Sequence, residues 1–236
     1  MRNIQLFGFD IYCNGAEKCI AEIKSRAGKI HIISGNAEVL KYPLADKGVY
    51  ALFKQIENII IPDGISVYYP AKRKNKACKK IPGIELMQLL LEEYSNSGKS
   101  VYFLGAKKSV IENMIPKIRA QFPRLMIAGH HHGYFDKNNC HDIIDNIKES
   151  KAHALFAALG TPAQERFIFE YMNQLPCSLF MGVGGSFDVL SGAIKRSPKW
   201  MRLAGLEWLY RLLRNPSKIS RIQNNIAFII KAFLFG

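Results

Sequence analysis

Several polar side chains that could act on a substrate stand at the ends of short apolar runs. Asp63 follows the run 59–62 and can serve as a general base, because a carboxylate beside a buried strand is partly desolvated yet can face a cleft. Ser34 and Asn36 close the run that begins at Lys29 and could bind the same ligand. Asp-Gly is also a common turn pair, and Ser or Asn can cap a helix, so structural roles stay open.

A glycine-rich turn, Gly182-Val-Gly-Gly-Ser-Phe-Asp188, follows the last apolar run. Bare backbone N–H groups at the start of a helix can approach an anion closely, and cations follow this turn along the chain. The pattern predicts a ligand that carries phosphate. The sequence has neither a Gly-Lys-Ser/Thr phosphate loop nor a Gly-x-Ser-x-Gly elbow, which disfavours kinase-like phosphate loops and serine hydrolases.

Three consecutive histidines, His130 to His132, invite a metal interpretation. Adjacent residues of an extended segment point to opposite faces, so the three cannot easily ligate one ion. We expect one histidine at a strand end to contact an anionic ligand, with Tyr134 as a stacking surface. The sequence also lacks an Asp-x-Asp pair, which counts against a divalent metal held by paired carboxylates.

The elements that must position these residues alternate between strand and helix patterns. A short strand over 4–9 and a helix near 16–26 come first, and the later apolar runs lie at 29–34, 59–61, 100–106, 125–130, 154–160 and 178–182. Such runs, separated by helices, predict an α/β fold: a mainly parallel, Rossmann-like sheet covered by helices. The ligand crevice of an open α/β sheet lies outside the carboxyl ends of its strands, so we expect the polar residues to converge there.

Size and charge divide the chain in two. It has 236 residues, 48% of them hydrophobic, enough for a full core, and a net charge of +14. Residues 195–236 hold nine lysines and arginines against the single acid Glu207. We therefore predict an α/β catalytic domain over 1–194 and a helical, basic appendage over 195–236. The excess charge indicates a polyanionic partner, either a nucleic acid or an anionic membrane.

Two further segments have alternative interpretations. From Ile219 onward, apolar residues recur at helical spacing, which is typical of an amphipathic helix that packs on its own domain or lies at a membrane interface. Residues 72–80 form a basic stretch that we expect to be a solvated loop with a mobile tip.

The cysteines and the apolar runs bear on the cellular setting. The five cysteines are odd in number and scattered without a C-x-x-C pair, so neither a disulfide framework nor a zinc site is predicted, and a reducing cytosol fits. No signal-peptide pattern opens the chain. No apolar run reaches the roughly 18 residues that a membrane span needs.

The motifs together resemble one family, the WecG/TagA/CpsF bacterial glycosyltransferases. The matching blocks, in order, are Ser34-Gly-Asn36, Ile61 to Gly64, Gly83 to Leu86, His131 to Phe135, Leu159 to Glu165, Gly182 to Asp188, Lys195 to Lys199 and Gly205 to Arg211. They cover almost the whole chain, and the last blocks are the most specific. The histidine block is closer to the TagA branch of wall teichoic acid synthesis than to the WecG branch.

The resemblance implies an inverting transfer of N-acetylmannosamine, or a related sugar, from a UDP donor to polyprenyl-diphosphate-linked N-acetylglucosamine. It implies no metal and no cofactor, and a cytoplasmic enzyme that is peripheral on the inner face of the bacterial cell membrane. There the appendage would close over the site, and a homo-oligomer is compatible with this reading. The alternative is a non-catalytic, basic α/β module that binds nucleic acid. Its cations, however, accompany an amphipathic apolar helix and not interleaved aromatics.

Carried over by motif, the resemblance gives Asp63 the role of general base and places the Ser34 hydroxyl where the family usually has threonine. The residues expected to bind substrate are Asn36, Lys80, His131, Tyr134, Gln164, Gly184, Gly185, Asp188, Arg211, Arg214 and Arg221. Two departures leave the donor sugar open. Ala163 replaces the usual lysine before Gln164, and Lys80 replaces an arginine, which loses the bidentate fork of the guanidinium.

Overall fold

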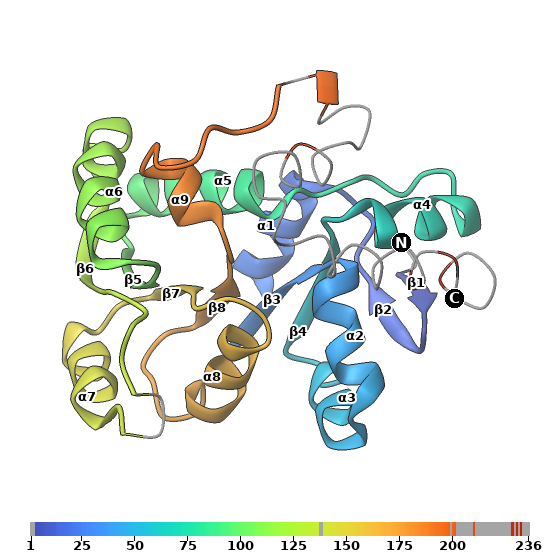
Figure 1. Ribbon diagram of the computed structural model, residues 1–236, viewed down its shortest axis with the longest axis horizontal. Coiled ribbons are helices and arrows are strands. Elements are labelled where there is room, and N and C mark those ends of the chain that lie inside the picture. Colours follow the sequence, from blue (N-terminus) through green and yellow to red (C-terminus); the bar gives the residue numbers. More distant parts are fainter. Residues whose placement is uncertain are drawn as a thin grey trace.

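The computed structural model describes residues 3–136, 139–198, 200, 201, 210, 228, 230 and 232. Figure 1 shows a sheet with helices on both faces. The strands are β1 (Ile4–Leu6), β2 (Phe9–Ile11), β3 (Ile30–Gly35), β4 (Asn58–Pro62), β5 (Ser100–Gly105), β6 (Met126–His131), β7 (Ala154–Ala158) and β8 (Leu179–Gly182). The helices are α1 (Ala16–Ser25), α2 (Ala37–Ala45), α3 (Lys47–Phe53), α4 (Ile65–Lys74), α5 (Gly83–Ser97), α6 (Lys108–Gln121), α7 (His141–Ser150), α8 (Ala163–Tyr171) and α9 (Ser186–Leu190).

The strands form one sheet in the order β1-β2-β4-β3-β8-β7-β5-β6. Only β1 is antiparallel to its neighbour; every other pair of adjacent strands is parallel. The carboxyl ends of six neighbouring strands, from β4 to β6, therefore meet at one edge. The predicted Rossmann-like α/β class is confirmed.

Alternate side chains of each central strand enter cores on opposite faces. In β4, Ile59 and Ile61 pack with α1, α5 and α6, while Ile60 packs with α2, α3 and α4. A third cluster lies under α7 and α8, around Phe180 of β8. Both faces of the sheet are thus covered by helices, as Figure 1 shows, which explains why the strands read as continuous apolar runs.

The two halves of the sheet meet where β3 lies beside β8, with Ile32 opposite Met181. The chain forms β1 to β4 in one half of the sheet, crosses to β5 and β6 at the far edge, and returns through β7 to place β8 against β3. In open α/β sheets the ligand crevice forms where the strand order changes direction, outside the carboxyl ends. This boundary is the expected place for the site.

The structure corrects two sequence predictions at the β1–β2 edge. The single strand predicted over 4–9 is a hairpin, because Phe7 and Gly8 both have positive φ and make a tight turn. The predicted loop over 72–80 is shorter, since α4 continues to Lys74, where its last-turn cations face the negative end of the helix dipole.

The cysteine prediction is wrong at one pair. Cys13, just after β2, is disulfide-bonded to Cys78, just before the segment that leads into α5. The other three cysteines, Cys19, Cys140 and Cys177, are free and buried. The bond ties the edge of the sheet to the chain that approaches the strand ends.

A few residues of the predicted appendage fall within the described part of the chain. Phe228 is buried, with its ring 5.2 Å from that of Phe7, and Ala232 joins the same apolar cluster. At these positions the tail packs on its own domain, which is one of the two interpretations left open above. Among the residues that the structure describes, no helix is long and apolar enough to cross a membrane.

Candidate active site

Ser34 and Asp63 lie side by side because β3 and β4 are neighbours, with Gly35 paired to Pro62. The N–H of Gly83, the first residue of α5, donates to Oδ1 of Asp63 at 2.9 Å. A Cβ on Gly83 would lie 2.6 Å from the Ser34 hydroxyl and 3.7 Å from Asp63 Oδ2. The three residues therefore form one compact cluster, with the carboxylate of Asp63 oriented by the start of a helix.

Asn36 completes this cluster from the β3 side. Its Oδ1 accepts the N–H groups of Glu38 and Val39, at 3.0 and 3.1 Å, and so caps α2. Its Nδ2 donates to the carbonyl of Ser34 at 3.1 Å. The helix-capping role is confirmed, and the cap fixes the turn that follows Ser34.

Gln164 lies across the end of β8, where the structure places it beside the glycine turn. Its side chain is buried, and its Oε1 accepts the N–H of Gly184 at 3.1 Å. A Cβ on Gly182 would lie 2.6 Å from Gln164 Nε2, so the carboxamide packs directly on that glycine. The Ser34 hydroxyl reaches the carbonyl of Gly182 at 3.4 Å, which links this group to the cluster around Asp63.

Sequence reasoning assigned no role to Glu165, which the structure buries beside Gln164. Its Oε1 accepts the Nε2–H of Gln164 at 2.8 Å. Burial raises the pKa of this carboxyl to about 7, because hydrogen bonds from Gln164 and Thr161 offset only part of the desolvation. The signal available in the sequence was an acid in the first turn of a helix that begins just after a strand end.

Lys80 belongs to the segment that leads into α5. The N–H of Ile81 donates to the carbonyl of Pro62 at 3.1 Å, and the N–H of Lys79 donates to that of Cys13 at 3.0 Å. Together with the disulfide at Cys78, these bonds hold half-buried Lys80 next to the turn that carries Asp63. The structure thus brings Lys80 to the same end of the sheet.

His131 and Tyr134 are not part of the cluster around Asp63. His131 is the last residue of β6 and Tyr134 follows it, and β6 is four strands away from β3, or about 19 Å at the usual strand spacing. The loop turns back over β5, since the N–H of Gly133 donates to the carbonyl of Ala106 at 2.8 Å. Tyr134 is 69% exposed. No three ligating side chains gather for a metal in the part of the chain that the structure describes.

The glycine turn ends in a short helix. Gly185 is exposed and precedes α9, which has five residues, and Asp188 is half-buried within it. Gly184 has positive φ, a conformation that suits glycine, and its N–H is engaged by Gln164. Three of the predicted site residues, Arg211, Arg214 and Arg221, lie outside the described residues.

Sequence reasoning also gave no role to Arg196, which the structure places close to the site. Its Nη2 forms an ion pair with Oε1 of Glu85 at 2.6 Å, and Glu85 lies in the first turn of α5. The chain that leaves α9 is therefore anchored two residues from Gly83. The Lys-Arg-Ser-Pro block of the sequence was the available signal.

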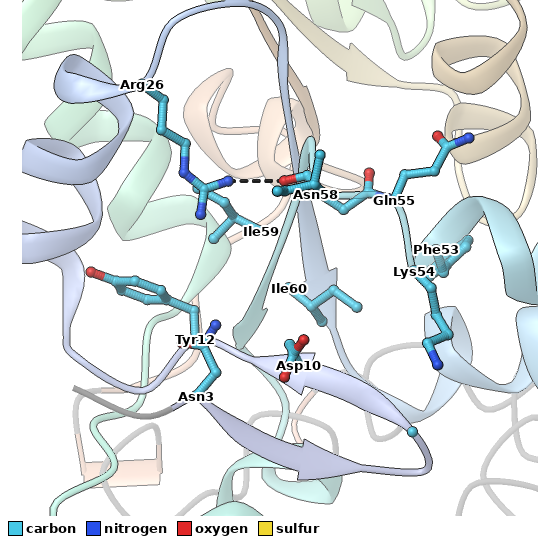
Figure 2. A pocket seen from close by; sticks show the side chains of 12 residues that line it. Asn3, Asp10, Tyr12, Arg26, Phe53, Lys54, Gln55, Asn58, Ile59 and Ile60 are labelled. Carbon is cyan, nitrogen blue, oxygen red and sulfur yellow. Dashed lines mark hydrogen bonds between the residues drawn. The ribbon is translucent and has the colours of Figure 1, made fainter.

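A separate cavity lies elsewhere on the molecule. It has a volume of about 230 Å³ between β2, β4 and the end of α3, and Figure 2 shows Asp10, Arg26 and Lys54 around it. Arg26 donates there to the carbonyl of Ile56 at 3.0 Å. The wall of the cavity includes Asn58 to Ile60, which are the first residues of β4. Asp63 lies at the other end of this strand, directly after its last residue. The cavity is thus distinct from the candidate site.

Fold and site together define a Rossmann-like α/β enzyme, with a carboxylate, a hydroxyl and a carboxamide gathered outside the ends of β3, β4 and β8. The model of the glycosyl transferase WecG/TagA/CpsF family matches residues 4–235. The chain belongs to this family and is a glycosyltransferase.

Three relatives share the same name, N-acetylglucosaminyldiphosphoundecaprenol N-acetyl-beta-D-mannosaminyltransferase. The protein of Bacillus subtilis strain 168 is 35% identical over 188 residues, 79% of this chain and 72% of the relative. That of Bacillus spizizenii is 36% identical, covering 81% and 74%. That of Staphylococcus aureus strain MW2 is 33% identical, covering 86% and 79%. By their name, these relatives transfer N-acetylmannosamine to N-acetylglucosamine that is linked to undecaprenyl diphosphate.

Proposed function

We propose that this protein transfers N-acetylmannosamine, or a related sugar, from a UDP donor to polyprenyl-diphosphate-linked N-acetylglucosamine, with inversion at the anomeric carbon, in the synthesis of a cell-wall polymer such as teichoic acid. The observation that carries the proposal is the contact of Asp63 with Gly83 beside Ser34, at the boundary of the two half-sheets. The named activity of relatives that match most of the chain supports the choice of sugar and acceptor.

Asp63 is the base in this mechanism. The Gly83 N–H holds Oδ1 of Asp63, and the carboxylate takes the proton of the acceptor hydroxyl. The hydroxyl oxygen then bonds to C1 of the donor on the face opposite UDP, and the bond from C1 to the UDP oxygen breaks. Ser34, 9% exposed beside Asp63, binds the reacting hydroxyl or its neighbour.

The departing UDP gains negative charge, which fixed donors must stabilise. We assign this role to the Gly185 N–H, Lys80 and the arginines Arg211, Arg214 and Arg221. Gly184 shapes the turn, because its N–H is held by Gln164. One preorganised donor of this kind is worth about 3 kcal/mol of barrier. The proposal includes no metal ion and no cofactor.

The remaining predicted residues line the same edge of the sheet. Asn36, Gln164 and Asp188 border the donor side, whereas His131 and Tyr134 approach from the half of the edge formed by β5 and β6. Exposed Tyr134 offers an aromatic surface to the acceptor sugar.

A product assay tests the function. The protein is incubated with UDP-N-acetylmannosamine and a soluble lipid-diphosphate N-acetylglucosamine, and UDP release, the mass of the product and its anomeric configuration by NMR are measured. We expect a disaccharide-lipid of inverted configuration, with UDP-N-acetylglucosamine and UDP-glucose as comparison donors. If UDP were released from one of the comparison donors but not from UDP-N-acetylmannosamine, the choice of sugar would be wrong. Loss of activity in EDTA with recovery in magnesium would overturn the metal-free mechanism.

We propose further that residues 195–236 bind an anionic membrane surface on the cytoplasmic side, where the acceptor lipid is presented. The nine cations of this segment support the proposal, since each contributes about 1 kcal/mol near an anionic leaflet. Flotation with vesicles containing anionic lipid should be lost when Arg211, Arg214 and Arg221 are replaced by glutamate, and vesicles of neutral lipid serve as the control. Unchanged flotation would refute the membrane role.

A further inference from the structure

Two adjacent polar side chains in the first turn of α8 are both withdrawn from solvent. Gln164 and Glu165 are each 2% exposed, although polar residues in the first turn of a helix are mostly solvated. They lie beneath the glycine turn that follows β8. A buried carboxyl is costly unless it does something for the structure or the site, so its contacts define its role.

The contacts form a chain of two hydrogen bonds from Gly184 through Gln164 to Glu165, called the relay below. Glu165 Oε1 accepts the Nε2–H of Gln164 at 2.8 Å, and Gln164 Oε1 accepts the Gly184 N–H at 3.1 Å. A carboxamide has one donor end and one acceptor end. If it were reversed, its oxygen would face the carboxyl oxygen of Glu165 and its NH₂ would face the N–H of Gly184. Gly184 and Glu165 therefore select the same orientation of the Gln164 amide, and Glu165 supplies the acceptor that holds its NH₂ end.

Gly182 links the Gln164 carboxamide to the cluster around Asp63. The carboxamide packs on Gly182, where a Cβ would lie 2.6 Å from its nitrogen. The carbonyl of Gly182 is 3.4 Å from the Ser34 hydroxyl, which in turn lies against Gly83. A change at Glu165 can therefore move the glycine turn and Ser34 without touching either.

We propose that Glu165 is a positioning residue: its carboxyl group holds the Gln164 carboxamide with the oxygen on the Gly184 N–H, and so fixes the glycine turn against Ser34. Glu165 reaches the glycine turn through its hydrogen bond with Gln164, so its effect on the site passes through Gln164. As a role in catalysis, this inference rests on the proposed function.

Hydrogen exchange tests the positioning itself, with or without activity. Glu165→Met keeps the volume and removes the acceptor, Glu165→Ala removes both, and Glu165→Gln keeps an acceptor oxygen. Exchange of the amides in 182–186 should accelerate at least about tenfold in the Met and Ala variants and stay near wild type in the Gln variant. Glu170→Gln, an exposed acid of the same helix, is the matched control. Unchanged exchange in whichever of the Met and Ala variants folds would overturn the proposal.

A kinetic cycle tests the route through Gln164. Glu165→Met should lower kcat about tenfold or more with a smaller change in KM, and Glu165→Gln should restore it. In a Gln164→Ala background, Glu165→Met should cost nothing further, because the relay is already broken. Additive losses would refute the relay. If the wild type transfers no sugar while the exchange result holds, the proposed function fails and the positioning of the turn stands.

Discussion

The N–H of Gly83 meets the carboxylate of Asp63 at 2.9 Å, and Gly83 itself leaves room for only a hydrogen atom beside Ser34. The helix start that orients the proposed base also packs against the hydroxyl next to it. Helix α5, strand β3 and strand β4 are thereby locked at one point, which is the point where the chemistry is proposed.

Gly83→Ala tests this packing. The new methyl group would lie 2.6 Å from the Ser34 hydroxyl but 3.7 Å from its Cβ. We expect Gly83→Ala to lower the free energy of unfolding by about 1–3 kcal/mol. Adding Ser34→Ala should recover most of that loss, since the clashing oxygen is gone. Urea denaturation of both single variants and the double variant measures the coupling, and purely additive losses would disprove the contact.

Glu165 predicts a dependence of stability on pH. The pKa of its carboxyl is about 7 in the folded protein against an ordinary 4.5. The stability that comes from the protonated carboxyl is therefore fully present below pH 4.5 and is lost as the pH rises through 7. The loss is on the order of 3 kcal/mol. Glu165→Gln, which cannot ionise, should therefore gain stability relative to wild type at pH 8 but not at pH 4.5. Equal differences at the two pH values in urea denaturation would refute the raised pKa.

The burial of His31 should make stability depend on pH in the opposite direction. His31 is fully buried in β3 against the ring of Phe169, and burial lowers its pKa to about 3, an effect that Asn58 only partly offsets. The stability that comes from keeping His31 neutral is fully present above pH 6.5 and is lost as the pH falls toward 3. At pH 4.5 the free energy of unfolding should be lower by on the order of 3 kcal/mol. His31→Leu should flatten the acid limb of the unfolding curve. His141→Asn, at an exposed histidine, should leave it unchanged.

The Cys13–Cys78 disulfide predicts sensitivity to reduction. Closing a loop between residues 65 apart stabilises the folded state by about 4 kcal/mol. Dithiothreitol should lower the melting temperature of the wild type and have no effect on Cys13→Ser/Cys78→Ser. Thiol titration of the unreduced, denatured protein should count the three free cysteines, Cys19, Cys140 and Cys177. A count of five would refute the bond.

The sequence was most informative where one local cause decides the structure. Continuous apolar runs predicted β3 to β8 within a few residues, and for the strands inside the sheet the reason is that a strand buried on both faces must be apolar throughout. The hairpin at Phe7 was missed because its turn lacks the usual Asn-Gly pair. The pairing of Cys13 with Cys78 was missed because spacing carries no information on connectivity.

The candidate site was predictable by position along each strand but not across the sheet. Ser34, Asn36, Asp63 and Gln164 come together because β4, β3, β8 and β7 are consecutive and Gln164 follows β7. His131 also lies at the end of a strand, yet the strand order places it four strands from β3. That order, and the inward turn of Glu165, depend on tertiary packing that no local pattern encodes.

The most direct test of the account is the turnover of Asp63→Asn. Asparagine keeps an oxygen for the Gly83 N–H, so we expect the melting temperature and UDP affinity to stay close to wild type. Removal of the base should lower kcat for transfer from UDP-N-acetylmannosamine to the lipid-diphosphate acceptor by about 10² to 10⁴. A kcat within a few fold of wild type, in a folded variant that still binds UDP, would contradict the assignment of Asp63 as the catalytic base.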